Sequence, residues 1–178
     1  MRKSVALNPI LKMFEGGDRR SIGRADGVAE MLKRNPRLFP QLIAGLWSAD
    51  PLVRMRTADA TEKVTREKPE LLLPYKKPLL ALLRTEEQAE VRWHLAVMVP
   101  RLRLNAKERA FAMEGLLRYL QDGSSMVKTF ALQGLADLAR TDAGIRSGVI
   151  EILREATRNG SAAMKARSRK LLGEIGED

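Results

Sequence analysis

Apolar residues recur along the chain with a period close to 37 residues. Four apolar anchors, each followed at once by Arg or Lys, stand 38, 36 and 37 residues apart. Further residues follow each anchor after eight and eleven positions, and offsets of zero, eight and eleven share one face of an α-helix. Each anchor is therefore expected near the start of an amphipathic helix. The anchors are Val53, Val91, Val127 and Met164, followed by Thr61, Val99, Leu135 and Leu172 at eight and by Val64, Leu102, Leu138 and Ile175 at eleven.

A second apolar pattern precedes each anchor and indicates a partner helix. It comprises Leu42, Leu79, Leu116 and Val149, then Leu46, Leu83, Leu120 and Leu153, at spacings of 37, 37 and 33 residues. Two apolar helix faces that recur with nearly the same period are typical of a two-helix repeat. The apolar side of such a repeat is buried only when neighbouring repeats stack. The sequence therefore predicts an all-α fold, a right-handed α-α superhelix (solenoid) of about five two-helix repeats. One domain, 1–178, is expected to hold the repeats 1–34, 35–68, 69–104, 105–141 and 142–178.

Capping residues mark helix starts at matching places. Asp50-Pro51 supplies an N-cap and a first-turn proline. Gly123-Ser124 and Gly160-Ser161, 37 residues apart, each end one helix and cap the next. Two pairs fit the capping-box pattern, namely Thr85 with Gln88 and Asn105 with Glu108.

The first repeat is degenerate, as expected for a terminal repeat with only one neighbour. Gly16-Gly17 indicates a turn, and a helix is expected from about Asp18 to Arg34. One face of that helix would be lined by Ala25, Val28, Ala29 and Leu32.

The turn before Val53 carries a motif. Asp50-Pro51-Leu52-Val53-Arg54 resembles the opening of the second helix in HEAT repeats, and Val91-Arg92 and Val127-Lys128 match its Val-Arg core. The resemblance implies HEAT-like repeats over nearly the whole chain. It also implies that Asp50, Arg54 and Arg92 link successive repeats by hydrogen bonds. In later repeats the place of the aspartate is taken by Gln88, Ser124 and Ser161.

Composition narrows the class of protein. Of 178 residues, 44% are hydrophobic and 30% are charged, which is typical of a folded domain. The sequence contains no cysteine, which excludes disulfides, thiolate metal sites and cysteine catalysis. Its apolar runs are shorter than the roughly 18 residues of a membrane span. We expect a cytoplasmic protein with no metal and no cofactor.

Candidate catalytic residues are few. His94 is the only histidine, and one histidine with carboxylates alone is a poor zinc ligand set. No nucleophile-elbow motif accompanies it. Gly16-Gly17 lacks the GxxxxGK and GxGxxG patterns of phosphate-binding loops. The sequence therefore favours a protein that is not an enzyme.

Positive charge is concentrated on the predicted second helices. The net charge is +10; the ranges 19–34, 51–67, 86–103, 124–140 and 161–175 hold 18 Lys and Arg against 10 Asp and Glu, compared with 14 against 12 elsewhere. Second helices line the inner face of a HEAT-like solenoid, so a basic concave face is expected. The alternative is a solvated face with hydrogen bonds between repeats. The candidate partner-binding bases are Arg54, Arg56, Arg92, Lys128, Lys165, Arg167 and Arg169.

The second helix of the third repeat is apolar nearly all round. Trp93 and Val97 form a second stripe beside the face that begins at Val91. Either neighbouring repeats bury both stripes, or Trp93 serves as an aromatic anchor for a partner.

These features predict a non-catalytic interaction scaffold whose concave face binds a protein partner, preferably an acidic one. The alternative is nucleic-acid binding through a basic concave groove. HEAT-like alkylpurine DNA glycosylases are similar in fold only, because their sites combine tryptophans with a catalytic aspartate, whereas Val97 stands one turn beyond Trp93. An enzyme built on the same scaffold is the third hypothesis.

Overall fold

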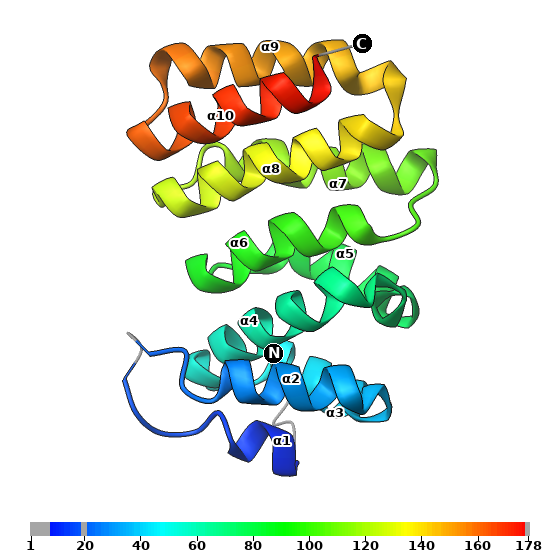
Figure 1. Ribbon diagram of the computed structural model, residues 1–178, viewed down its shortest axis with the longest axis vertical. Helices are drawn as coiled ribbons and strands as arrows, with labels where there is room; N and C mark the ends of the chain where they lie inside the picture. The colour runs from blue at the N-terminus through cyan, green and yellow to red at the C-terminus, as the bar shows by residue number, and fades with distance from the viewer. Residues whose placement is uncertain (1–7, 19–20, 177–178) are drawn as a thin grey trace. The chain divides into compact units, whose positions relative to one another are not determined.

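The computed structural model describes residues 8–18 and 21–176, and every regular element in these ranges is a helix (Figure 1). The predicted all-α class is therefore confirmed. The chain falls into two compact units that divide after Pro74, which we call the N-terminal unit and the C-terminal unit. The single five-repeat domain and its superhelical arrangement stay predictions. No described helix has both the length and the hydrophobicity that a membrane-spanning segment requires.

The N-terminal unit is built around one long helix, α4 (Pro51–Glu67). Three elements pack against α4: α2 (Ala25–Arg34), α3 (Phe39–Ile43) and the 3-10 helix η2 (Ala44–Trp47). A short 3-10 helix, η1 (Pro36–Leu38), joins α2 to α3, and α1 (Pro9–Lys12) packs on α3. A further 3-10 helix, η3 (Pro69–Tyr75), leads out of this unit. The fully buried side chains include Leu11, Phe14, Val28, Leu32, Leu42, Ile43, Leu46, Val53 and Val64.

Helix α2 begins later than the sequence pattern suggested. The predicted start near Asp18 is wrong, because α2 begins at Ala25. Gly23 has a φ of +57° and its N–H donates to Ser21 Oγ at 3.0 Å, so the chain turns immediately before the helix. The predicted apolar face is confirmed, since Ala25, Val28, Ala29 and Leu32 are buried.

The C-terminal unit contains three helical hairpins that pack in chain order (Figure 1). They are α5 (Lys76–Thr85) with α6 (Ala89–Met98), α7 (Ala106–Tyr119) with α8 (Ser125–Thr141), and α9 (Ala143–Asn159) with α10 (Ala162–Ile175). The second helices α6, α8 and α10 pack side by side in one layer. A 3-10 turn, η4 (Val99–Arg101), extends α6 up to Leu102. Among the first helices α5 packs on α7, whereas α9 packs on α8 and α10.

Most predicted caps are present. Asn105 and Glu108 form a capping box in which each side chain accepts the other residue's backbone N–H at 2.9 Å. The side chains of Asp50, Ser124 and Ser161 cap α4, α8 and α10 by accepting N–H groups of the first turn. These bonds satisfy amides that have no partner inside the helix.

The capping box predicted for Thr85 and Gln88 is wrong. Thr85 is still part of α5, and its hydroxyl donates to the carbonyl oxygen of Ala81 at 3.2 Å. The turn is instead stabilised by Glu86, whose Oε1 accepts the N–H groups of Glu87 and Gln88 at 3.0 and 2.9 Å.

The buried positions of α9, the first helix of the last hairpin, align with those of α7 one turn away from the predicted alignment. The sequence pattern paired Val149 with Leu116 at a spacing of 33 residues. The buried residues of α7 and α9 instead correspond at a uniform spacing of 37, so the predicted spacing is wrong. The buried pairs are Ala112 with Val149, Leu116 with Leu153, and Tyr119 with Ala156.

Gly134 sets how closely α8 approaches α6. This glycine is buried, and a Cβ built on it would overlap the backbone carbonyl oxygen of Ala96. The backbone of the neighbouring helix offers no side-chain end that could move aside. A glycine in mid-helix therefore has a packing reason here.

We expect Gly134→Ala to destabilise the C-terminal unit by about 1–2 kcal/mol, because overpacking against the backbone outweighs the gain in helix propensity. Urea denaturation followed by circular dichroism measures the change. Gly173→Ala in α10 is the matched control, because no neighbouring atom lies within 4 Å of its Cβ. The control should stabilise by up to about 1 kcal/mol, and an equal gain from both substitutions would contradict the proposed contact.

Candidate functional site

Two of the predicted partner-binding bases are buried in the N-terminal unit. Arg54 is 6% exposed, and its Nη1 donates to the carbonyl oxygens of Ser48 and Ala49, both at 2.9 Å. These bonds hold the turn that precedes α4. Arg54 therefore has a structural role within its own hairpin.

Arg56 organises the loop between α1 and α2. It is 3% exposed, and its guanidinium donates to four backbone carbonyl oxygens at 2.7 to 3.2 Å. The planar guanidinium presents five donors and so satisfies several carbonyls at once. Gly23 is required at this place, because a Cβ there would lie 2.9 Å from Arg56 Cζ. The four acceptors belong to Phe14, Gly16, Asp18 and Ser21.

We expect Arg56→Lys to destabilise the N-terminal unit by about 1–3 kcal/mol, because a single ammonium leaves buried carbonyls without donors. A Glu-specific protease should also cut after Glu15 faster, since the loop loses its anchor. Arg66→Lys is the control, because the Arg66 side chain is 67% exposed and pairs with Glu62 on its own helix. Unchanged cleavage in Arg56→Lys would show that the loop is held by other contacts.

In the C-terminal unit Arg92 links two successive hairpins. Its Nη1 donates to Asp122 Oδ2 at 2.5 Å, and its Nε donates to the carbonyl oxygen of Glu86 at 2.6 Å. The guanidinium carbon also lies 5.7 Å from the centre of the Tyr119 ring. The turn between α5 and α6 is thereby joined to the turn between α7 and α8. Asp50, the predicted partner of Arg92, lies in the other unit, so their link stays a prediction.

Asp122 was not among the predicted linking residues. The predicted aspartate position lies three residues before each anchor, whereas Asp122 stands five residues before Val127. The sequence does contain a pattern that points to Asp122, because oxygen-bearing side chains recur five residues before the anchor in three turns. In each, the side chain accepts the N–H group two residues further on: Ser48 from Asp50, Glu86 from Gln88, and Asp122 from Ser124.

We expect Asp122→Asn to destabilise the C-terminal unit by about 1.5–3 kcal/mol, because the amide can keep the turn but no longer pairs a charge with Arg92. Thermal and urea unfolding measure this loss. Glu151→Gln is the control, because its partner Arg154 lies on the same helix and both side chains are more than half exposed. Such exposed pairs are worth about 0.3–0.5 kcal/mol, so equal losses would contradict a special role for Asp122.

Lys128 and Lys165 occupy the position of Arg92 in the two following second helices, but lack its partner. Asn159 stands 37 residues after Asp122, so no carboxylate follows Lys128 in that register. Neither side-chain ammonium group forms a hydrogen bond or an ion pair within the described part of the chain. Both lie near the starts of their helices, and these starts are adjacent, since Ser125 Oγ and Ser161 Oγ are 2.7 Å apart. Two half-buried lysines therefore lie near two positive helix termini.

At the far ends of α8 and α10 the charges are balanced. Arg140 contacts both Asp137 and Glu174, and Lys170 lies 3.8 Å from Glu174. Burial raises the pKa of the Asp137 carboxyl, which accepts a hydrogen bond from Gln133 Nε2 at 2.9 Å. The described ion pairs thus offset the positive charge at these ends of the helices, unlike that of the two lysines near the starts.

The remaining predicted residues lie on α6 and α10. Trp93 is half-buried and stacks at a tilt on His94, with ring centres 5.8 Å apart, while Val97 is 9% exposed. Arg167 donates to Gln133 Oε1 at 2.8 Å and lies over the Phe130 ring, and Arg169 is exposed. Within the described ranges no group of His, Cys, Asp and Glu is arranged to hold a metal ion.

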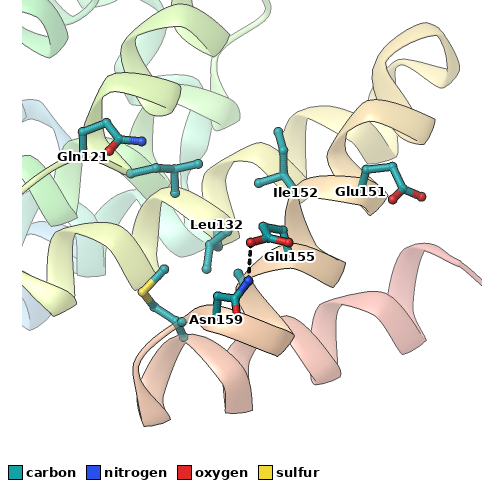
Figure 2. Close-up of a pocket in the computed structure, with 10 residues that line it drawn as sticks. Gln121, Leu132, Glu151, Ile152, Glu155 and Asn159 are labelled. Atoms are coloured by element: carbon teal, nitrogen blue, oxygen red, sulfur yellow. Dashed lines mark hydrogen bonds between the residues drawn. The ribbon is translucent and has the colours of Figure 1, made fainter.

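An open groove that the sequence did not predict lies at the junction of the last two hairpins (Figure 2). It has a volume of about 610 Å³. Gln121 approaches it from the end of α7, Leu132 from α8, and a row of residues from α9. Figure 2 also shows Asn159 donating to Glu155 at the border of the groove, at 2.5 Å. The lining residues are Leu120, Gln121, Leu132, Glu151, Ile152, Glu155, Ala156, Asn159, Gly160 and Met164.

Comparisons with known proteins add no assignment to this geometry. A scan against models of protein families, a search of curated proteins and a search of solved structures each found no match for the chain.

Proposed function

We propose that this chain is a non-catalytic interaction scaffold, a right-handed solenoid of HEAT-like repeats, that binds an acidic protein partner on the face formed by its second helices. The repeat spacing of 36 to 37 residues and the chain-order packing of the three hairpins in the C-terminal unit support the repeat architecture. The Arg92–Asp122 bond supports it further, because it joins successive hairpins through an arginine and an aspartate, although this aspartate stands at another position than the resemblance implies.

The observation that carries the proposed partner chemistry is the pair of unpaired lysines, Lys128 and Lys165. Arg92 holds the same place but is neutralised by Asp122. Two like charges near adjacent helix N-termini repel each other. Each cation is also repelled by the positive end of its helix dipole, at a cost of about 0.3–1 kcal/mol. An acidic group of a partner relieves this repulsion, so association gains electrostatic energy that the free chain lacks.

The contact surface would combine these lysines with residues on the same layer. Trp93 supplies a half-buried aromatic residue in the middle of α6, and Arg169 supplies an exposed cation on α10. Aromatic residues flanked by arginine are typical of the energetically important parts of interfaces. Arg54 and Arg56 do not belong to this proposed surface, because both side chains are buried and donate to backbone carbonyls.

The test compares two charge reversals of equal size. Lys128→Glu with Lys165→Glu removes the proposed site, and Lys77→Glu with Lys107→Glu makes the same change in net charge on exposed residues of α5 and α7. The probe is a fluorescein-labelled peptide of alternating Glu and Phe, measured by fluorescence anisotropy. We expect the first variant to weaken binding about tenfold, which corresponds to about 1.4 kcal/mol, and the control to change it about twofold at most.

Two results would overturn the proposal. Equal weakening in both variants would mean that the peptide senses only net charge. Binding of duplex DNA in preference to the peptide, with a log–log salt slope of about −0.9 per phosphate contact, would replace the protein partner with nucleic acid.

A further inference from the structure

Two successive junctions in the C-terminal unit form equivalent clefts. The first lies where the α5–α6 turn meets the α7–α8 turn, and the second is the groove where the α7–α8 turn meets the α9–α10 turn. Five residues that line the first cleft have counterparts 37 positions later that line the second. These pairs are Leu83 with Leu120, Arg84 with Gln121, Arg118 with Glu155, Tyr119 with Ala156, and Asp122 with Asn159.

The chain fills the first cleft with an aromatic side chain of its own. Tyr119 is only 5% exposed, and the guanidinium of Arg92 lies over its ring. The open space that remains measures about 210 Å³. In the second cleft Ala156 stands where Tyr119 would be, and the open space is about 610 Å³. The groove is therefore the same packing site without its tyrosine.

A second exchange keeps the groove open. In the first junction Gly115 receives the side chain of Leu83, since a Cβ on Gly115 would lie 2.6 Å from Leu83 Cδ2. The counterpart of Gly115 is Ile152, which lines the groove together with Leu120. A branched side chain in that place leaves no room for the close approach that the glycine allows, and the main contacts of α9 are with α8 and α10.

The rim of the groove has the opposite charge to that of the first cleft. Arg118 is replaced by Glu155 and Arg84 by Gln121, and Glu151 adds a second carboxylate (Figure 2). Hydrogen bonds from Asn159 and then from Arg158 lower the pKa of Glu155, so its carboxylate stays ionised. Among the described residues the ion pairs of Glu151 and Glu155 are with Arg154 and Arg158 of their own helix, and such exposed pairs exchange partners at little cost.

We propose that this groove binds an aromatic side chain of a protein segment that carries arginine next to it. The aromatic ring takes the place that Tyr119 fills in the first cleft and covers Leu132, Ile152 and Met164. The arginine pairs with Glu151 or Glu155 and reproduces the cation that Arg92 places over Tyr119. The site shares no residue with the lysine surface, so this inference goes beyond the acidic partner and does not depend on it.

The experiment uses the capped peptide Arg-Ala-Tyr-Ala-Arg and the full chain. We expect saturable shifts of the Met164 and Ile152 methyl signals in NMR spectra, with an affinity in the millimolar range. The matched peptide Arg-Ala-Ala-Ala-Arg should bind at least about fivefold more weakly, because it lacks the ring.

Ala156→Tyr refills the groove with the residue that the first cleft already accommodates, and it should abolish the shifts. Ala166→Tyr, at an exposed position on α10, is the control and should leave them unchanged. Glu151→Lys with Glu155→Lys alters only exposed side chains, so it keeps the test valid if Ala156→Tyr fails to fold. That variant should weaken binding at least about fivefold through charge repulsion.

The proposal is overturned if the peptide without tyrosine binds equally well. It is also overturned if neither Ala156→Tyr nor the double lysine variant weakens the shifts. Lys128→Glu with Lys165→Glu should leave this binding intact, which separates a failure of the groove from a failure of the acidic-partner surface.

Discussion

Burial of apolar surface between consecutive second helices is the interaction on which the C-terminal unit depends. A single hairpin leaves one apolar side in water, and only the next hairpin removes it. Val91 and Val127 are fully buried at this contact, and Gly134 lets the α8 backbone reach the carbonyl oxygen of Ala96. Because each hairpin must present the same face to the next, the spacing of 36 to 37 residues is a packing requirement, and the residues that meet at each junction of this unit are placed by that register.

This dependence explains which parts of the fold could be predicted from the sequence. Helix faces are set by local periodicity, so the buried positions that follow Val53, Val91 and Val127 could be predicted with the caps at Ser124 and Ser161. The start of α2 could not, because it depends on Arg56, whose carbonyl acceptors lie 35 to 42 residues away in sequence. The alignment of α9 was missed because leucine also recurs one turn away, and only burial separates the two registers.

In the candidate sites, too, local features could be predicted from the sequence and long-range contacts could not. The number of basic residues on the second helices could be counted from the sequence. The count cannot show that Arg54 and Arg56 bind backbone carbonyls, or that the ammonium groups of Lys128 and Lys165 lack partners among the described residues. A charge becomes available to a partner only where the register supplies no acid to neutralise it. Asp122 neutralises Arg92, and the exchange of Asp122 for Asn159 one repeat later leaves Lys128 unpaired. Whether a basic residue is available to a partner thus depends on two positions, its own and the position that meets it from the next hairpin.

The groove arises in the same way, but from an apolar position in place of a charged one. Tyr119 and Ala156 hold equivalent places, yet one completes the packing of a junction and the other leaves it open. An open apolar junction is costly for an isolated chain, since about 25 cal/mol is lost for each Å² of apolar surface left in water. The stack tolerates this loss because the neighbouring contacts of α9 with α8 and α10 hold the hairpin in place. Binding sites in such a repeat therefore arise where a packing position is vacated while the register that surrounds it is kept.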